Sequence, residues 1–255
     1  MEPMPRRLAV PGEVPDNPHL HLDDVAVPDV VLRLAAGRSI VPVWRNEIGG
    51  VTFAIDDGAE YVKVGPPHRE FVPAAEAQRL GWLAGHVRVP QVLGYDSEPD
   101  GTLWLHTSGL PGTSAVLDPW LTRPAQVVPE LGRALRAFHD RVPVRSCPWT
   151  WSVAERRALK GSELSELGDV PPEDLVVCHG DACNPNFILD ADGASLGYVD
   201  LGLCGVADRW ADLAPALISL GWNYGPGWEP AFLAGYGIDL DADKLSYYTR
   251  LWEAE

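Results

Sequence analysis

The sequence predicts an α+β protein of two lobes, a small lobe of mostly antiparallel sheet with one helix and then a mainly helical lobe. Strand patterns separated by Gly and Asp turns fill the first half. Helix-length amphipathic patterns fill the second half, and a Gly/Pro-rich stretch lies where the pattern changes. We therefore expect an extension with a short helix at 1–39, a first lobe at 40–107, a linker at 108–112 and a second lobe at 113–255.

The first half contains three strand patterns with turn signals at Glu47-Ile48-Gly49-Gly50 and Asp56-Asp57-Gly58, which predicts an antiparallel meander. A helix pattern and two more strand patterns follow the meander, and a short helix precedes it. The expected strands are 40–44, 51–55, 60–64, 90–94 and 102–107, and the expected helices are 29–36 and 69–84.

The second half begins with an amphipathic helix that places Val127, Leu131, Leu135 and Phe138 on one face. Short strands then alternate with turns before helices fill the rest of the chain. The expected helices are 125–141, 152–167, 208–220, 228–236 and 242–253, and the expected strands are 175–178, 187–189 and 196–200.

The overall charge limits the classes of partner. With 20 Lys+Arg against 36 Asp+Glu, the net charge of −16 repels nucleic-acid phosphates and anionic membranes, so we expect neither as a partner. An acidic surface would attract a cationic small molecule, although solubility alone also explains it. The 4 cysteines form no C-x-x-C pair, and no apolar run reaches the roughly 20 residues of a membrane span. We expect a cytoplasmic protein that is a monomer or a weak homodimer.

Asp181, Asn186 and Asp200 are the first candidates for chemistry. Asp181 lies in a loop after a strand, Asn186 opens the next strand, and Asp200 ends the strand that returns. A hairpin of this length brings its two ends together, so the sequence predicts two carboxylates and a carboxamide near one another. Such oxygen donors suit Mg²⁺ with substrate phosphates, and phosphoryl transfer needs this arrangement. The alternative is that they are ordinary turn residues, which is the better explanation for Asp190 and Asp192.

The segments HGDACNPN (179–186) and YVDLGLCGVADRWADLA (198–214) resemble those of the aminoglycoside phosphotransferases, especially the 3′-phosphotransferase branch. The resemblance implies a bilobal protein-kinase-like fold, ATP and Mg²⁺ as cofactors, and an antibiotic hydroxyl as acceptor. It implies Asp181 as catalytic base and Asn186 and Asp200 as metal ligands. His179 would be structural, and Asp212 would brace the catalytic loop; a solvated helix carboxylate is the alternative for Asp212.

The resemblance also implies a lysine on the third strand that reaches the nucleotide phosphates, and Lys63 is the lysine in a strand pattern. Glu76 on the next helix would hold it, with Glu70 as the weaker candidate. An exposed edge lysine and a solvated glutamate are the alternatives. Gly49-Gly50 suits a loop close to phosphates, although Gly-Gly hairpins are common. Thr107 would lie in the hinge that meets the adenine.

The acceptor pocket is the part of the chain that departs most from the family pattern. In the family, acidic residues at the chain end line the aminoglycoside pocket, which points to Glu253 and Glu255 as substrate-binding residues; a frayed tail is the alternative. The chain departs from many relatives in having Leu203 where they carry arginine, and in a short segment before Cys178. Two alternatives therefore stay open, namely a kinase of another cationic antibiotic or small hydroxyl metabolite, and a nucleotide-binding pseudoenzyme with a regulatory role.

Overall fold

The computed structural model describes residues 18–151, 153–160, 167–171 and 173–253, and these residues form two units. We call them the sheet unit, which comprises residues 18–111 together with Gly197–Gly202, and the helical unit, which comprises the described residues of Gly112–Leu196 and those from Leu203 onward. The boundary at Pro111 and Gly112 falls inside the expected linker. The short segment Gly197–Gly202 differs from expectation, because it groups with the sheet unit although it lies far along the chain.

One antiparallel sheet forms the centre of the sheet unit, with strand order β1-β2-β3-β5-β4. The predicted meander is confirmed, and β3 lies in the middle of the sheet. The strands are β1 (Ile40–Arg45), β2 (Val51–Ile55), β3 (Glu60–Gly65), β4 (Val92–Ser97) and β5 (Leu103–Ser108), and the helices are α1 (Asp29–Ala35) and α2 (Pro73–Leu83). Helix α2 begins at Pro73 rather than 69, in keeping with the preference for proline in the first helical turn.

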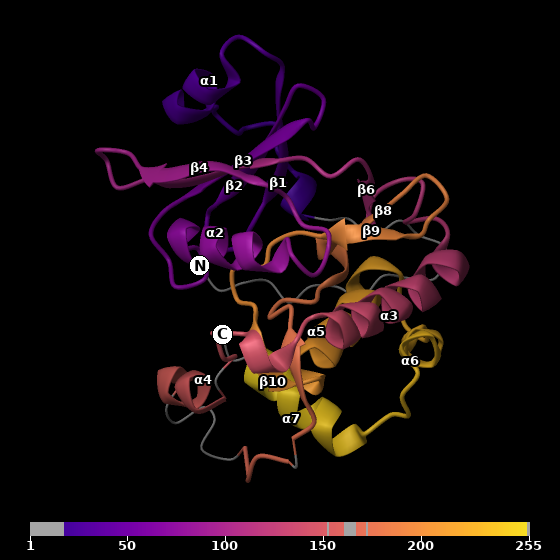
Figure 1. Cartoon of the computed structure of the whole chain (residues 1–255). Helices are drawn as coiled ribbons and strands as arrows, with labels where there is room; N and C mark the ends of the chain where they lie inside the picture. Colours follow the sequence, from indigo (N-terminus) through magenta and orange to yellow (C-terminus); the bar gives the residue numbers. More distant parts are fainter. Residues whose placement is uncertain (1–17, 152, 161–166, 172, 254–255) are drawn as a thin grey trace. The chain divides into compact units, whose positions relative to one another are not determined.

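The alternation of side chains along the strands gives the two faces of this sheet different roles. Helix α1 covers one face, while α2 contacts β4 and β5, and the two helices lie on opposite sides of the sheet in Figure 1. The core under α1 contains Val30, Val31, Ala35, Phe53, Ile55, Val62 and Val64. Since Val62 and Val64 point into this core, Lys63 between them points to the other face.

Helix pairs build most of the helical unit. Helix α3 (Pro124–Arg141) packs against α6 (Glu229–Tyr236), and α5 (Trp210–Asn223) packs against α7 (Ala242–Glu253). All four helices were expected; α7 agrees to the residue, and the other three differ by one to three residues at one or both ends. Helix α4 (Val153–Lys160) lies within the helix expected at 152–167, while Leu167 at its expected end is not helical. Among the described residues, no helix combines the length and apolar character needed to cross a membrane.

Two small sheets carry the loop segments of the helical unit. One has the order β6-β8-β9, formed by Thr113–Ser114, Phe187–Leu189 and Ser195–Tyr198. The other pairs β7 (Leu175–Cys178) with β10 (Gly205–Asp208) in antiparallel register. Strands β6 and β10 were not predicted, because such short segments carry too little periodicity to mark a strand. Strand β9 ends at Tyr198, two residues before the predicted end at Asp200.

Candidate functional site

The loop that follows β7 is built around Gly180. Its φ of +93° is a left-handed conformation that glycine adopts without strain. A Cβ at this position would lie only 2.3 Å from the carbonyl oxygen of Leu203, so any side chain would clash with the backbone. The loop ends in a short 3₁₀ helix, Asn184–Asn186, that leads into β8. Glycine at 180 therefore permits the tight path that presents Asp181.

Within this loop, the side chain of Asn186 holds Asp181. The amide Nδ2 of Asn186 donates to the carbonyl oxygen of Asp181 at 2.9 Å and to its carboxylate Oδ2 at 3.1 Å. Asn186 is buried, whereas Asp181 is half-buried, so Asn186 supports Asp181 from the interior. Because Nδ2 is engaged with Asp181, the carbonyl oxygen Oδ1 is the atom of Asn186 suited to bind a cation.

Asp212 at the start of α5 accepts hydrogen bonds from the backbone of the loop. Its Oδ2 accepts from the amide of His179 at 2.6 Å, and its Oδ1 accepts from the amide of Gly180 at 2.9 Å. The side chain is fully buried, so the alternative of a solvated helix carboxylate is wrong. A carboxylate that accepts two backbone amides at once fixes their relative orientation, and with it the position of Asp181.

Helix α5 holds the loop at a second place, through Asn184. The amide nitrogen of Asn184 donates to Ser219 Oγ at 3.0 Å, and its side-chain Nδ2 donates to the carbonyl oxygen of Ala216 at 3.2 Å. Sequence reasoning missed Asn184 and Ser219. The signal available was the repeat of polar or small residues along one face of the helix, at 212, 216 and 219.

His179 is fully buried and packs against the rings of Phe138 and Phe187, with centroid distances of 6.1 and 6.4 Å. This placement is consistent with a structural role and leaves the imidazole away from solvent. Trp151 is also buried, and its indole Nε1 donates to the carbonyl oxygen of Gly180 at 3.3 Å. Trp151 is thus a further support of the loop that the sequence did not single out.

In the sheet unit, Lys63 of β3 meets Asp200, which lies 137 residues further along the chain. The Lys63 Nζ lies 2.7 Å from Asp200 Oδ1 and 3.8 Å from Glu76 Oε2 of α2. The side chain of Lys63 is only 16% exposed, so an exposed edge lysine is the wrong description. Asp200 has a φ of +59°, a conformation that is uncommon for residues other than glycine and that concentrates at functional sites.

Glu76 is buried, which excludes the solvated alternative for this residue. Burial raises the pKa of Glu76 to about 7; the charge of Asp200 adds to the rise, and the ammonium of Lys63 opposes it. Glu70 lies outside α2, and its carboxylate is near His68 and Arg69. The structure therefore favours Glu76 over Glu70 as the carboxylate beside Lys63.

The remaining predicted residues lie at separate places. Gly49 and Gly50 form the turn between β1 and β2, where Gly49 has a φ of +84° and the Gly50 amide donates to the side chain of Asn46. Thr107 is half-buried in β5 and pairs with Tyr61 and Val92. Glu253 is exposed at the last residue of α7. Glu255 lies outside the described residues.

Comparison with known proteins gives consistent matches over most of the chain. A family model described as phosphotransferase enzyme family matches residues 51–160 and 150–248. An aminoglycoside 3′-phosphotransferase of Streptomyces fradiae is 32% identical in an alignment 251 residues long, and the alignment covers 83% of this chain and 93% of that protein.

Solved structures agree with the sequence matches. The structure of an aminoglycoside-3′-phosphotransferase of type VIII has a TM-score of 0.71 and 28% identity, with 86% of this chain and 94% of that chain covered. An aminoglycoside phosphotransferase from Streptomyces rimosus, in complex with ADP and streptomycin, has a TM-score of 0.64 and 28% identity, with 88% and 95% covered. The predicted kinase-like fold is confirmed by these similarities.

Proposed function

The chain belongs to the aminoglycoside phosphotransferase family, and from that premise we propose that it transfers the γ-phosphoryl group of ATP to a hydroxyl of an aminoglycoside, at the 3′ position. The observation that carries the proposal is the meeting of Lys63, Asp200 and Glu76, residues brought from distant parts of the chain to one place. Phosphorylation of the antibiotic would inactivate it and so confer resistance. The cytoplasm, where ATP is available, is the compartment we infer.

The helical unit would supply the groups that act on the acceptor. Asp181 would accept the proton of the attacking hydroxyl while the oxygen of that hydroxyl forms a bond to the γ-phosphorus. The bond from the γ-phosphorus to the β,γ-bridging oxygen breaks at the same time, and ADP leaves. The hydrogen bonds from Asn186 to Asp181 support this role, because they orient the carboxylate before the substrate arrives.

The sheet unit would supply the groups that act on the nucleotide. Lys63 would bind the phosphates, and Glu76 would hold its ammonium group in place when Asp200 is occupied by a cation. The turn at Gly49-Gly50 would approach the phosphates, and the backbone around Thr107 would meet the adenine. A relative whose solved complex contains ADP supports a nucleotide of this type.

Mg²⁺ is the cation that suits the type of donor proposed here. The carboxylate of Asp200 and the carbonyl oxygen of Asn186 are hard oxygen ligands, the type that Mg²⁺ binds together with substrate phosphates. Asp200 is 42% exposed on its side chain, so its carboxylate is accessible to a cation. When bound, Mg²⁺ would neutralise the charge that develops on the phosphate oxygens.

The acceptor is proposed on charge as well as on family. A net charge of −16 favours a polycationic substrate, and the exposed carboxylate of Glu253 at the end of α7 is suited to pair with a substrate ammonium group. Glu255 would add a further negative charge. The streptomycin complex of a relative is consistent with the same class of acceptor.

A coupled assay of ADP release tests the proposal. The wild type should turn over ATP with kanamycin or neomycin in a saturable way, and Asp181→Ala should lose about 10²-fold or more of kcat with little change in the KM for ATP. Asp192→Ala is the matched control, because it removes the same charge from an exposed turn of the neighbouring hairpin and should leave kcat unchanged.

The product identifies the position that is phosphorylated. Phosphorus and proton NMR of purified product should place the phosphate at the 3′ oxygen. Phosphate at another hydroxyl would correct the regiochemistry, and ATP turnover only with other cationic alcohols would replace the substrate class. Binding of ATP·Mg²⁺ without turnover on any acceptor would contradict the enzyme and favour a regulatory nucleotide-binding protein.

A further inference from the structure

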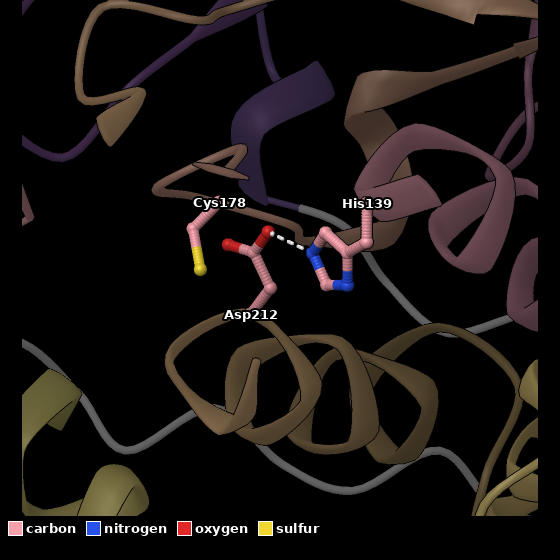
Figure 2. A group of neighbouring side chains, drawn as sticks. All are labelled: His139, Cys178 and Asp212. Carbon is pink, nitrogen blue, oxygen red and sulfur yellow. Dashed lines mark hydrogen bonds and ion pairs between the residues drawn. The ribbon is translucent and has the colours of Figure 1, made fainter. Parts of the chain in front are cut away.

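His139 of α3 contacts the carboxylate that holds the candidate catalytic loop. Its Nε2 lies 3.0 Å from Asp212 Oδ2, and both side chains have no exposed surface. Figure 2 shows the His139 ring turned toward the Asp212 carboxylate, with the Cys178 thiol on the other side of that carboxylate. Asp212 Oδ2 is the same atom that accepts the His179 amide, so His139 acts on the loop through a shared oxygen.

The group His139, Cys178 and Asp212 has the composition of a metal site, with ligand atoms within 4.8 Å of one another. The hydrogen bonds argue against a metal here. Both oxygens of Asp212 accept backbone amides, and both ring nitrogens of His139 have partners. Burial raises the pKa of the Cys178 thiol, so the sulfur stays protonated and is a poor ligand. A complete hydrogen-bond network is the better description.

The network continues from His139 to Tyr236 of α6. The Tyr236 hydroxyl lies 2.7 Å from His139 Nδ1, and Arg209 Nη1 donates to the Tyr236 oxygen at 3.1 Å. Burial raises the pKa of the Tyr236 phenol, so it keeps its proton. With its oxygen accepting from Arg209, Tyr236 can donate its proton to Nδ1 of His139, and His139 then donates from Nε2 to Asp212.

We propose that His139, oriented by Tyr236, is a positioning residue of the phosphotransferase, which fixes the Asp212 carboxylate and through it the loop that carries Asp181. The proposal rests on the proposed function of that loop. The two loop amides bind both oxygens of Asp212, so without a further contact the carboxylate and the loop could shift together. A third donor from a different helix ties the carboxylate to α3, and pre-organisation of this kind favours the transition state over the bound substrate.

The hydrogen-bond donor of His139 can be removed or replaced without a large change in side-chain volume, so the test separates the hydrogen bond from packing. A glutamine at position 139 can present an amide N–H at about the place of the histidine Nε2, whereas a leucine fills similar space and presents no donor. Tyr236→Phe removes the hydroxyl and keeps the ring. Val128→Ala is a matched structural control, because Val128 is fully buried in the same helix and its apolar side chain makes no hydrogen bond to the network.

The experiment measures kcat and KM for ATP with an active aminoglycoside, on folded protein quantified by circular dichroism. His139→Leu should lower kcat about tenfold, a loss of about 1.4 kcal/mol of transition-state stabilisation, with the KM for ATP within about twofold of wild type. His139→Gln should recover most of kcat, and Tyr236→Phe should lie between. Val128→Ala should keep wild-type kcat per folded molecule even where its melting temperature falls.

Three results would overturn the proposal: wild-type kcat in His139→Leu, no recovery in His139→Gln, or an equal loss of kcat in Val128→Ala. If His139→Leu does not fold, the other two variants still test the proposal. A wild-type kcat in Tyr236→Phe together with a large loss of kcat in His139→Gln would contradict the proposed chain of hydrogen bonds from Tyr236 through His139 to Asp212. A wild type inactive on every acceptor would reject the proposed function instead, which separates the two failures.

Discussion

The crossing of α3 and α6 depends on two glycines that allow the helices to touch through their backbones. A Cβ on Gly132 would lie 2.2 Å from the carbonyl oxygen of Phe232 and 2.8 Å from the amide nitrogen of Tyr236. A Cβ on Gly235 would lie 2.2 Å from the carbonyl oxygen of Pro129. We therefore expect Gly132→Ala to force the two helices apart and to destabilise the protein.

The size of the effect follows from the distances. Real Cβ atoms essentially never approach other atoms closer than 3.0 Å, so the contact of 2.2 Å requires the backbones to part by at least about 0.8 Å. Forcing extra volume into a packed contact costs about 1–3 kcal/mol, and alanine returns up to about 1 kcal/mol through its higher helix propensity. Because the clash is with backbone, we expect a net loss of about 2 kcal/mol.

Gly81→Ala is the matched control, because Gly81 is exposed in α2 and a Cβ there meets nothing within 4 Å. It should stabilise the protein by up to about 1 kcal/mol. Urea unfolding followed by tryptophan fluorescence and circular dichroism gives both values, with the two probes testing whether the transition is two-state. If Gly132→Ala is as stable as Gly81→Ala, the helices do not touch at Gly132 as described, and the reasoning fails.

Two further predictions concern buried charges. Lys244→Met should lower the free energy of unfolding by about 3–5 kcal/mol, because Lys244 Nζ lies 2.6 Å from the fully buried Asp208. Adding Asp208→Asn to this variant should restore part of the loss in the same urea experiment. An unchanged free energy of unfolding in Lys244→Met would contradict the ion pair. Glu76 has a folded pKa of about 7 against an ordinary value of 4.5, so its contribution to stability is complete below pH 4.5 and is lost as the pH rises to about 7. Glu76→Gln should not show this loss, and its stability relative to wild type should increase by roughly 3 kcal/mol between about pH 4.5 and pH 8; a difference that is constant across this range would refute the buried, protonated carboxyl.

Much of the fold could be predicted because its signals are local. The strands 51–55 and 175–178 and the helix 242–253 agree with the structure to the residue, since turns and apolar periodicity mark both ends of each. Strand β10 could not be predicted, because Gly205–Asp208 becomes a strand only by pairing with β7. The grouping of Gly197–Gly202 with the sheet unit is likewise a tertiary result, with the amide of Tyr198 donating to the carbonyl oxygen of Arg88.

The candidate site likewise contains residues that the sequence indicates and residues that only the tertiary structure brings out. Asp181, Asn186 and Asp200 lie in segments whose spacing is informative, and Lys63 stands out as a lysine in a strand pattern. His139 gives no such signal, because a histidine near the end of an amphipathic helix is indistinguishable from a surface residue until its neighbours are known. Its role depends on Asp212 of α5 and Tyr236 of α6, which lie 73 and 97 residues further along the chain.

The start of α5 explains why this part of the molecule tolerates two fully buried carboxylates. Asp208 accepts from the amide of Trp210 at 2.9 Å and pairs with Lys244, while Asp212 lies in the first turn and accepts the loop amides. Both are close to the N-terminus of the helix, where the helix dipole favours negative charge. The helix dipole thus stabilises the two buried carboxylate charges, which would otherwise destabilise the core. The carboxylate oxygens remain available to accept hydrogen bonds from the surrounding backbone amides. The loop that carries Asp181 is held by the start of one helix. Substitutions at Asp208 should therefore act mainly on stability, and substitutions at Asp212 should act on stability and kcat together.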